Sequence, residues 1–191
     1  LTDTAPWLLA YDSNARMVAH ARKRGLSVEK GLMESWRGGP FDAAYSLHGT
    51  FRHLLSEKAA LAHLRATARS LKPGGLYIVG FDLVRYGADS DDEELWEAHE
   101  GRREARLVVT SLPPTKQRRR ERVLNFLWWR DGAKDGTLQS QYDLRSYSRA
   151  EWLALLKGSP FRLESTYTVE GRRIPLDGAT RHALFALRRA D

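Results

Sequence analysis

The chain has 191 residues, of which 42% are hydrophobic and 29% charged, and this composition excludes disordered, fibrous and membrane-embedded proteins. Its length suits one domain with a sizeable core and is slightly long for a minimal domain, so we expect an insertion. The net charge of +7 is spread along the whole chain and is not concentrated in one segment, so it does not by itself indicate a nucleic-acid partner, and we expect none. The chain has no cysteine, no apolar run of membrane-helix length and no secretory signal in LTDTAPWLLAYD, which favours a cytoplasmic protein without a membrane partner.

Strand and helix signals alternate in the first half, as in a parallel sheet with helical crossovers. LLAY predicts a short buried strand that ends at Asp12. Ser13 or Asn14 then caps the helix ARMVAHARKR, which ends at Gly25 because glycine freely takes the left-handed conformation there. The chain therefore starts with a strand, an acid and a helix.

The same alternation continues to about residue 83. A short strand is expected around Ser27 to Glu29, and FDAAYSLHG predicts a fuller strand that opens on Phe41. Ser56 caps a helix whose apolar residues fall three or four apart on one face, and Lys72 to Gly75 form the turn after it. GLYIVGFDL is nearly all apolar, as expected of a strand buried on both faces.

The pattern changes over about residues 86–147. SDDEELWEAH predicts a short helix, with Ser90 and Glu93 placed as a capping box. EARLVVTSL, RERVLNFLWWRDG and TLQSQYDLRSY predict three consecutive strands with short links, which is typical of an antiparallel meander. Ser148 and Glu151 form a second capping box ahead of EWLALLKG, and FRLESTYTV and HALFALRRA predict two last strands.

Several of these stretches together resemble a class I S-adenosylmethionine-dependent methyltransferase: Asp12 at a strand end, FDAAYSLHGTFRHL and, above all, LAHLRATARSLKPGGLYIVGFDL. The resemblance runs from about Leu8 to Leu83 and resumes in RSYSRAEWLALLKGSPFRLES. It implies an α/β fold with a Rossmann-like methyltransferase sheet, mostly parallel with an antiparallel last strand and flanked by helices. The chain is then a single methyltransferase domain with an antiparallel β meander inserted as a lid at about residues 86–147.

The resemblance also reveals a departure. The family's first strand and glycine-rich loop have no counterpart before Leu1, and the glycine pairs Gly38-Gly39 and Gly74-Gly75 lie elsewhere. In the family, that strand lies between the strands that here end near Asp12 and Ser46. Because an empty place there leaves two rows of unpaired backbone groups, we expect the 191 residues to be an N-terminally incomplete part of a longer chain.

The cofactor that the resemblance implies is S-adenosyl-L-methionine. Asp12 accepts hydrogen bonds from both ribose hydroxyls, and the alternative is an acid that only interacts with the helix dipole. Ser13 touches the same ribose edge, unless it serves only as a cap. Met33 and Glu34 border the adenine, although a methionine is as often core filler. Further cofactor contacts are expected in the loop SLHGTF, at Ser46, Leu47 and His48.

His48 is also our candidate catalytic base for an oxygen or nitrogen nucleophile, and a histidine that only packs in the loop is the alternative. Methyl transfer from a sulfonium needs no enzyme nucleophile, because the electrophile is already activated. An insertion at the ligand-binding edge is well placed to roof the pocket and set acceptor specificity. The expected acceptor contacts, several of which equally suit a sheet surface, are Phe51, Tyr86, Tyr142, Arg145 and Tyr147.

Partners are predicted from two further stretches. NFLWW has apolar residues on both faces of its strand, so we expect one face to meet the body and the other a second subunit of a homodimer. KQRRRER suits phosphates, but it has no interleaved aromatic residue, and we favour a solvated hairpin end. The histidines are too scattered for a metal site to be predicted.

Three functions remain open at this point. The first is S-adenosylmethionine-dependent methyl transfer to a small-molecule acceptor through oxygen, nitrogen or carbon. The second is a non-enzymatic ligand-binding or dimerisation module of the same fold. The third, favoured only by charge, is an RNA methyltransferase.

Overall fold

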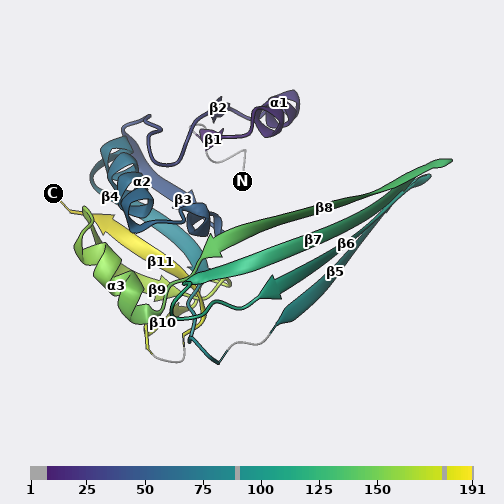
Figure 1. Cartoon of the computed structure of the whole chain (residues 1–191). Helices are drawn as coiled ribbons and strands as arrows, with labels where there is room; N and C mark the ends of the chain where they lie inside the picture. The colour runs from purple at the N-terminus through teal and green to yellow at the C-terminus, as the bar shows by residue number, and fades with distance from the viewer. Residues whose placement is uncertain (1–7, 89–90, 178–179, 191) are drawn as a thin grey trace.

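Figure 1 shows the computed structural model, which describes residues 8–88, 91–177 and 180–190. A sheet with helices packed against it forms the body, a long arm of four strands projects from it, and β1, α1 and β2 form a small unit beside it. In chain order the elements are β1 (Ala10–Asp12), α1 (Ala15–Lys23), β2 (Val28–Lys30), β3 (Phe41–Ser46), the 3-10 helix η1 (Thr50–His53), α2 (Glu57–Ser70), β4 (Leu71–Asp82), β5 (Asp92–Glu100), β6 (Arg103–Leu112), β7 (Arg120–Asp131), β8 (Lys134–Arg145), α3 (Arg149–Lys157), β9 (Phe161–Tyr167), β10 (Arg173–Ile174) and β11 (His182–Arg189).

The body sheet has the strand order β10-β9-β11-β4-β3. β3 pairs with β4 in parallel, and β11 lies between β4 and β9 and is antiparallel to both. β3, β4 and β9 therefore run in one direction and the last strand runs against them, which confirms the predicted antiparallel last strand. The expectation of a mostly parallel sheet is therefore met in part. β3, β4 and β9 point the same way, but only β3 and β4 pair in parallel, because β11 lies between β4 and β9.

The small unit contains a second parallel pair. β1 pairs with β2 from Ala10↔Val28 to Asp12↔Lys30, apart from the body sheet. Within the described ranges, β1 has β2 as its only partner and β3 has β4, so each keeps one unpaired edge. A strand between β1 and β3 stays a prediction.

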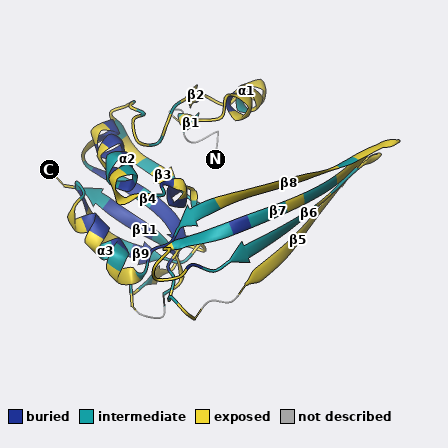
Figure 2. Ribbon diagram, viewed as in Figure 1, coloured by how far each residue is buried: buried dark blue, intermediate teal, exposed yellow. Residues whose placement is uncertain are grey.

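Aromatic residues dominate the core of the body. Phe51, Phe81, Trp152 and Phe185 are at most 1% exposed, and Trp152 contacts the other three with ring centroids 4.9 to 5.5 Å apart. Figure 2 shows that buried residues concentrate in the body, whereas the arm is mostly intermediate or exposed. No helix in the described part of the chain is long and apolar enough to cross a membrane.

Local signals placed the helices well. The Ser56 hydroxyl accepts the Ala59 N–H and begins α2, as predicted. The capping box of Ser148 and Glu151 is present at the start of α3 and confirms that prediction. The segment of Lys72 to Gly75 bulges within β4, and the pairing with β3 jumps from Phe41↔Leu71 to Ala43↔Leu76 around it.

The helix predicted for SDDEELWEAH is wrong, because Asp92–Glu100 form strand β5, which pairs with β6 along its whole length. Cross-strand contacts such as the Glu97 to Arg106 ion pair, 2.9 Å long, override the helical tendency of the acidic run. Glu93 lies inside this strand, and Ser90 lies outside the described residues. The predicted antiparallel meander is confirmed, but it has four strands where three were expected. They lie in the order β5-β6-β7-β8 and come between β4 and α3 in the chain.

Candidate functional site

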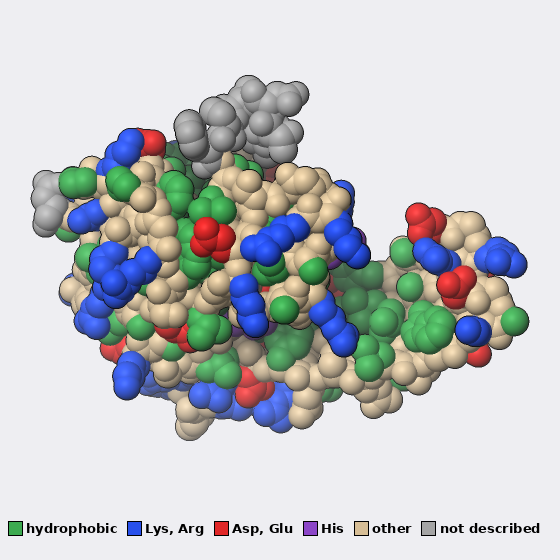
Figure 3. Space-filling model, turned by 90° about the horizontal axis from the view of Figure 1, so that it is seen from above, with side chains coloured by type: hydrophobic (Ala, Val, Ile, Leu, Met, Phe, Trp, Pro, Cys, Tyr) green, Lys and Arg blue, Asp and Glu red, His purple; other side chains and the backbone are tan. Residues whose placement is uncertain are grey.

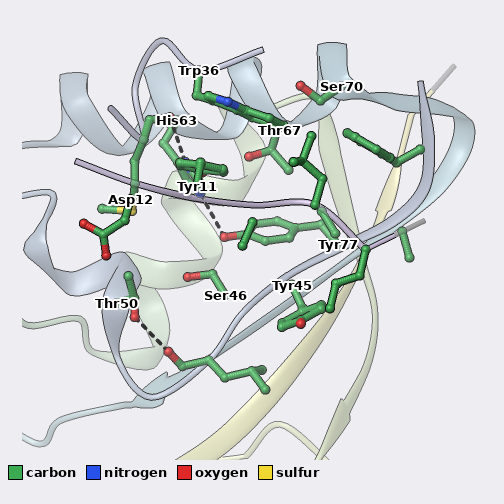
Figure 4. Close-up of a pocket in the computed structure, with 18 residues that line it drawn as sticks. Tyr11, Asp12, Trp36, Tyr45, Ser46, Thr50, His63, Thr67, Ser70 and Tyr77 are labelled. Atoms are coloured by element: carbon green, nitrogen blue, oxygen red, sulfur yellow. Dashed lines mark hydrogen bonds between the residues drawn. The ribbon is translucent and has the colours of Figure 1, made fainter. Parts of the chain in front are cut away.

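A pocket of about 390 Å³ lies between the small unit and the body sheet (Figure 4). Asp12 at the end of β1 and Ser46 at the end of β3 both line it, and Met33 lines it from the segment after β2. The carboxyl ends of parallel strands are where open α/β sheets bind ligands. The volume is within the range of small-molecule sites.

Asp12 reaches the pocket from the junction of β1 and α1. Its Oδ1 accepts the Asn14 N–H at 2.7 Å, and Asn14 in turn caps α1 by accepting the Arg16 N–H at 2.9 Å. In the described residues Oδ2 of Asp12 accepts no hydrogen bond, so this oxygen is available to a ligand hydroxyl. The cap is therefore Asn14, and Ser13 is exposed and does not line the pocket.

Stacked aromatic rings form one wall of the pocket. Tyr11 stacks on Trp36 with ring centroids 4.5 Å apart, and Trp36 lies parallel to Phe41 at 6.3 Å. Burial, and then the charge of Glu34, raises the pKa of the Tyr11 hydroxyl to about 12, so the hydroxyl stays protonated. Glu34 itself does not line the pocket. We missed Tyr11 and Trp36 in the sequence, although GLMESW carries an aromatic residue just beyond the two predicted adenine contacts.

The floor of the pocket is held by a buried histidine. His63 donates its Nδ1–H to the Met33 carbonyl at 3.0 Å, and its Nε2 accepts the Tyr77 hydroxyl at 2.8 Å. Burial disfavours the imidazolium and lowers the pKa of His63, although the Met33 carbonyl acts in the opposite direction. Burial also raises the pKa of Tyr77. These groups anchor the segment after β2 to α2 and β4.

Ser46 offers a second free polar atom. Its hydroxyl oxygen is buried and has no hydrogen-bond partner in the described residues. In Figure 4, Asp12, Ser46 and Thr50 lie toward one end of the pocket, and Trp36 and Ser70 lie toward the other. A buried hydroxyl without a partner costs free energy unless a ligand or water completes it.

The turn between β3 and η1 closes this end. Leu47 and Thr50 line the pocket, and the Thr50 hydroxyl donates to the Leu47 carbonyl at 3.0 Å. Between them His48 and Gly49 have φ of 54° and 73°, and the left-handed region is uncommon for a histidine. His48 is exposed at this turn and does not line the pocket.

The expected acceptor residues do not come together at this pocket. Phe51 is fully buried in the core, because η1 turns its ring inward against Phe81 and Trp152. Tyr147 is 1% exposed in the same core. The remaining three lie elsewhere: the Tyr86 hydroxyl donates to Glu151 at 2.8 Å, Tyr142 packs on His53 with ring centroids 5.5 Å apart, and the guanidinium of Arg145 lies over the Tyr147 ring at 5.3 Å.

Arg52 joins the turn to the arm. It forms an ion pair with Glu121 of β7, and its Nε donates to the Arg145 carbonyl at 3.0 Å. The side chains of the pair are only 7% and 18% exposed. No sequence pattern links two residues so far apart in the chain. The base of the arm is therefore fixed to the four-residue helix that also carries Thr50 of the pocket.

Comparison with known proteins gives matches in structure only. No protein-family model matches the sequence. A search of curated proteins also finds no match. The sugar N-methyltransferase KedS8 from Streptoalloteichus matches 100% of this chain and 74% of its own, with a TM-score of 0.79 and 18% identity.

Two further structures agree with this match. DesVI from Streptomyces venezuelae has a TM-score of 0.76 and 18% identity, with 96% of this chain and 74% of its own covered. CalS10, an amino pentose methyltransferase from Micromonospora echinaspora bound to S-adenosylmethionine, has a TM-score of 0.71 and 21% identity, with 97% and 75% covered. The chain therefore has the fold of the class I S-adenosylmethionine-dependent methyltransferases.

Proposed function

We propose that this chain is an S-adenosylmethionine-dependent methyltransferase that acts on a small molecule. The observation that carries the proposal is the pocket at the carboxyl ends of β1 and β3, where Asp12 Oδ2 and Ser46 Oγ have no hydrogen-bond partner among the described residues. Its position on a fold whose structural neighbours are methyltransferases supports this cofactor.

The residues of the pocket suit the parts of the cofactor. A free carboxylate oxygen on Asp12 accepts from a ribose hydroxyl, and the stacked Tyr11 and Trp36 offer a flat face for a purine. Met33 contacts the adenine from the pocket wall. The bound cofactor supplies an activated methyl group on sulfur, and the chain aligns it with the acceptor and excludes water. Ser46, Leu47 and the His48 turn would border the methionine end, Glu34 would act on the adenine side through its charge, and His48 would hold the acceptor's proton.

We further propose an amine on a sugar-like molecule as the acceptor. The neighbours KedS8 and CalS10 are described as a sugar N-methyltransferase and an amino pentose methyltransferase, which supports nitrogen over oxygen or carbon. A neutral amine attacks the sulfonium carbon directly and needs only a weak base to take its proton. Tyr86 and Tyr142 would then act from the arm side of the site.

Calorimetry with S-adenosylhomocysteine tests the cofactor assignment. We expect binding by the full-length protein, and Asp12→Ala to weaken it at least tenfold, because a charge-assisted hydrogen bond to ribose is lost. Ser13→Ala is a matched control that should change the affinity less than threefold, since Ser13 does not line the pocket. Failure of the full-length protein to bind would refute the assignment.

A non-enzymatic module of the same fold is the second candidate. The observation in its favour is that His48 and the expected acceptor residues do not line the pocket. This candidate predicts cofactor binding without methylation of any amino sugar. Turnover with such an acceptor would exclude it.

We also propose a homodimer formed through one face of the arm. The register places Trp96, Leu127 and Leu138 in one row across this face, with Trp129 on the same side one step further along. Trp96 and Leu138 are 61% and 60% exposed. Figure 3 shows hydrophobic side chains along the arm, between the body and a charged tip. An apolar face of this kind is usually covered by a partner.

Light scattering after size exclusion tests the dimer. Leu138→Glu should convert it to a monomer, because a charge would be buried in the apolar interface without a partner. Gln139→Glu adds the same charge on the opposite face of β8 and should leave the dimer intact. A monomeric protein at all concentrations would refute this proposal.

A further inference from the structure

A cationic hollow of about 630 Å³ lies at the base of the arm. The register of β7 and β8 puts it on the sheet face opposite to Tyr142, since Arg122 pairs with Asp143 and Val123 pairs with Tyr142. It shares no lining residue with the pocket between β1 and β3. Its lining residues are Lys116, Gln117, Arg118, Arg119, Arg120, Arg122, Asp143 and Arg145.

Only part of this positive charge is balanced. Asp143 pairs with Arg122 at 2.9 Å and with Arg120 at 3.9 Å, and Arg119 pairs with Glu151 at 3.1 Å. The other three cationic side chains form no salt bridge with any described residue: Lys116, Arg118 and Arg145. The hollow therefore carries uncompensated positive charge, which an anion would neutralise.

The guanidinium groups are already held in place. Arg118 donates through Nε to the Arg120 carbonyl and through Nη2 to the Pro113 carbonyl, both at 2.9 Å. Arg145 lies over the Tyr147 ring at 5.3 Å, and its Nε is buried without a hydrogen-bond partner in the described residues. Side chains fixed before a ligand arrives lose little rotamer freedom on binding.

We propose that this hollow binds a phosphate group carried on an organic ligand. Guanidinium groups form paired hydrogen bonds with carboxylates and phosphates alike, but a phosphate has more terminal oxygens and more negative charge, so it can bind several arginines at once. The hollow is open to solvent on one side, so a phosphate held by the arginines can carry an organic part that extends outward. Among the described residues no aromatic side chain lines the hollow, so this part of the chain gives it no stacking surface of the kind that single-stranded nucleic acids use.

Calorimetry with phenyl phosphate, orthophosphate and a single-stranded oligonucleotide tests the proposal without any methyl-transfer assay. We expect phenyl phosphate to bind more tightly than orthophosphate, with an affinity that falls as salt rises. Arg118→Gln should weaken phenyl phosphate at least tenfold, and Arg118→Lys should weaken it less, because lysine keeps the charge and loses the paired donors. Arg145→Met is a second variant and should also weaken binding.

Arg103→Gln is the matched control, because Arg103 is an exposed arginine at the far end of the arm, paired with Asp131. It should leave the affinity within twofold, and all variants should keep the wild-type circular dichroism and melting temperature. Equal effects of Arg118→Gln and Arg103→Gln would overturn the proposal. Tighter binding of orthophosphate than of phenyl phosphate would overturn the organic ligand, and displacement of phenyl phosphate by the oligonucleotide at lower concentration would indicate a nucleic-acid surface instead.

Discussion

Removing one member of the Arg52 to Glu121 pair should destabilise the protein far more than breaking a surface ion pair. Both side chains are largely buried, and Arg52 also donates to the Arg145 carbonyl at 3.0 Å and to the Ser146 hydroxyl at 3.4 Å. Glu121→Gln would therefore leave a guanidinium out of water without its counter-charge. The backbone of the arm would keep its own hydrogen bonds.

The expected cost follows from this burial. An uncompensated buried charge costs about 3–5 kcal/mol of unfolding free energy, whereas an exposed pair contributes about 0–1 kcal/mol. Arg52→Met should cost a similar amount, because it leaves the carboxylate without its partner. The double variant removes both charges, so its cost should fall below the sum of the single costs by about 1–3 kcal/mol.

Urea unfolding of the two single variants and the double variant measures these values. Arg106→Met is a suitable control, because its ion pair with Glu97 has side chains that are 59% and 44% exposed. The reasoning fails if Glu121→Gln costs no more than Arg106→Met. Strictly additive costs in the double variant would also contradict it, since they would mean that the two side chains do not interact.

Three further predictions concern stability. Since burial lowers the pKa of His63 below its usual 6.5, the unfolded chain takes up the proton first, and the unfolding free energy should decrease as pH falls below about 6.5; His63→Gln should flatten this dependence between pH 5 and pH 7.5, as measured by urea unfolding. Trp152→Ala should cost about 3–5 kcal/mol, because it empties a fully buried site among four aromatic rings, and an unchanged melting temperature would contradict the core described above. Ser148→Ala should cost about 1 kcal/mol through loss of the cap on α3, while Ser13→Ala, at an exposed serine that caps no helix, should change the unfolding free energy by less than about 0.5 kcal/mol.

Local chemistry made much of the fold predictable. Ser56, Ser148 and Glu151 cap their helices through contacts with residues three positions away, so the sequence contains the whole signal. The strand of Asp92–Glu100 was missed because its acidic run also suits a helix, and only pairing with β6 decides between the two.

The site was predictable in outline. Asp12, Met33, Ser46 and Leu47 were expected near a ligand because they follow strands, and the structure places all four on one pocket. Aromatic residues carried no such signal, since an apolar ring suits a core as well as a pocket wall. Phe51, which we expected at the acceptor site, lies in the core, whereas Trp36, which we did not single out, lines the pocket.

The 3-10 helix of Thr50–His53 contacts three parts of the molecule through consecutive side chains. Thr50 lines the pocket, Phe51 enters the core, and Arg52 carries the base of the arm. The pocket and the arm therefore share one support, since the residue that fixes the base of the arm lies only two positions from the one that lines the pocket.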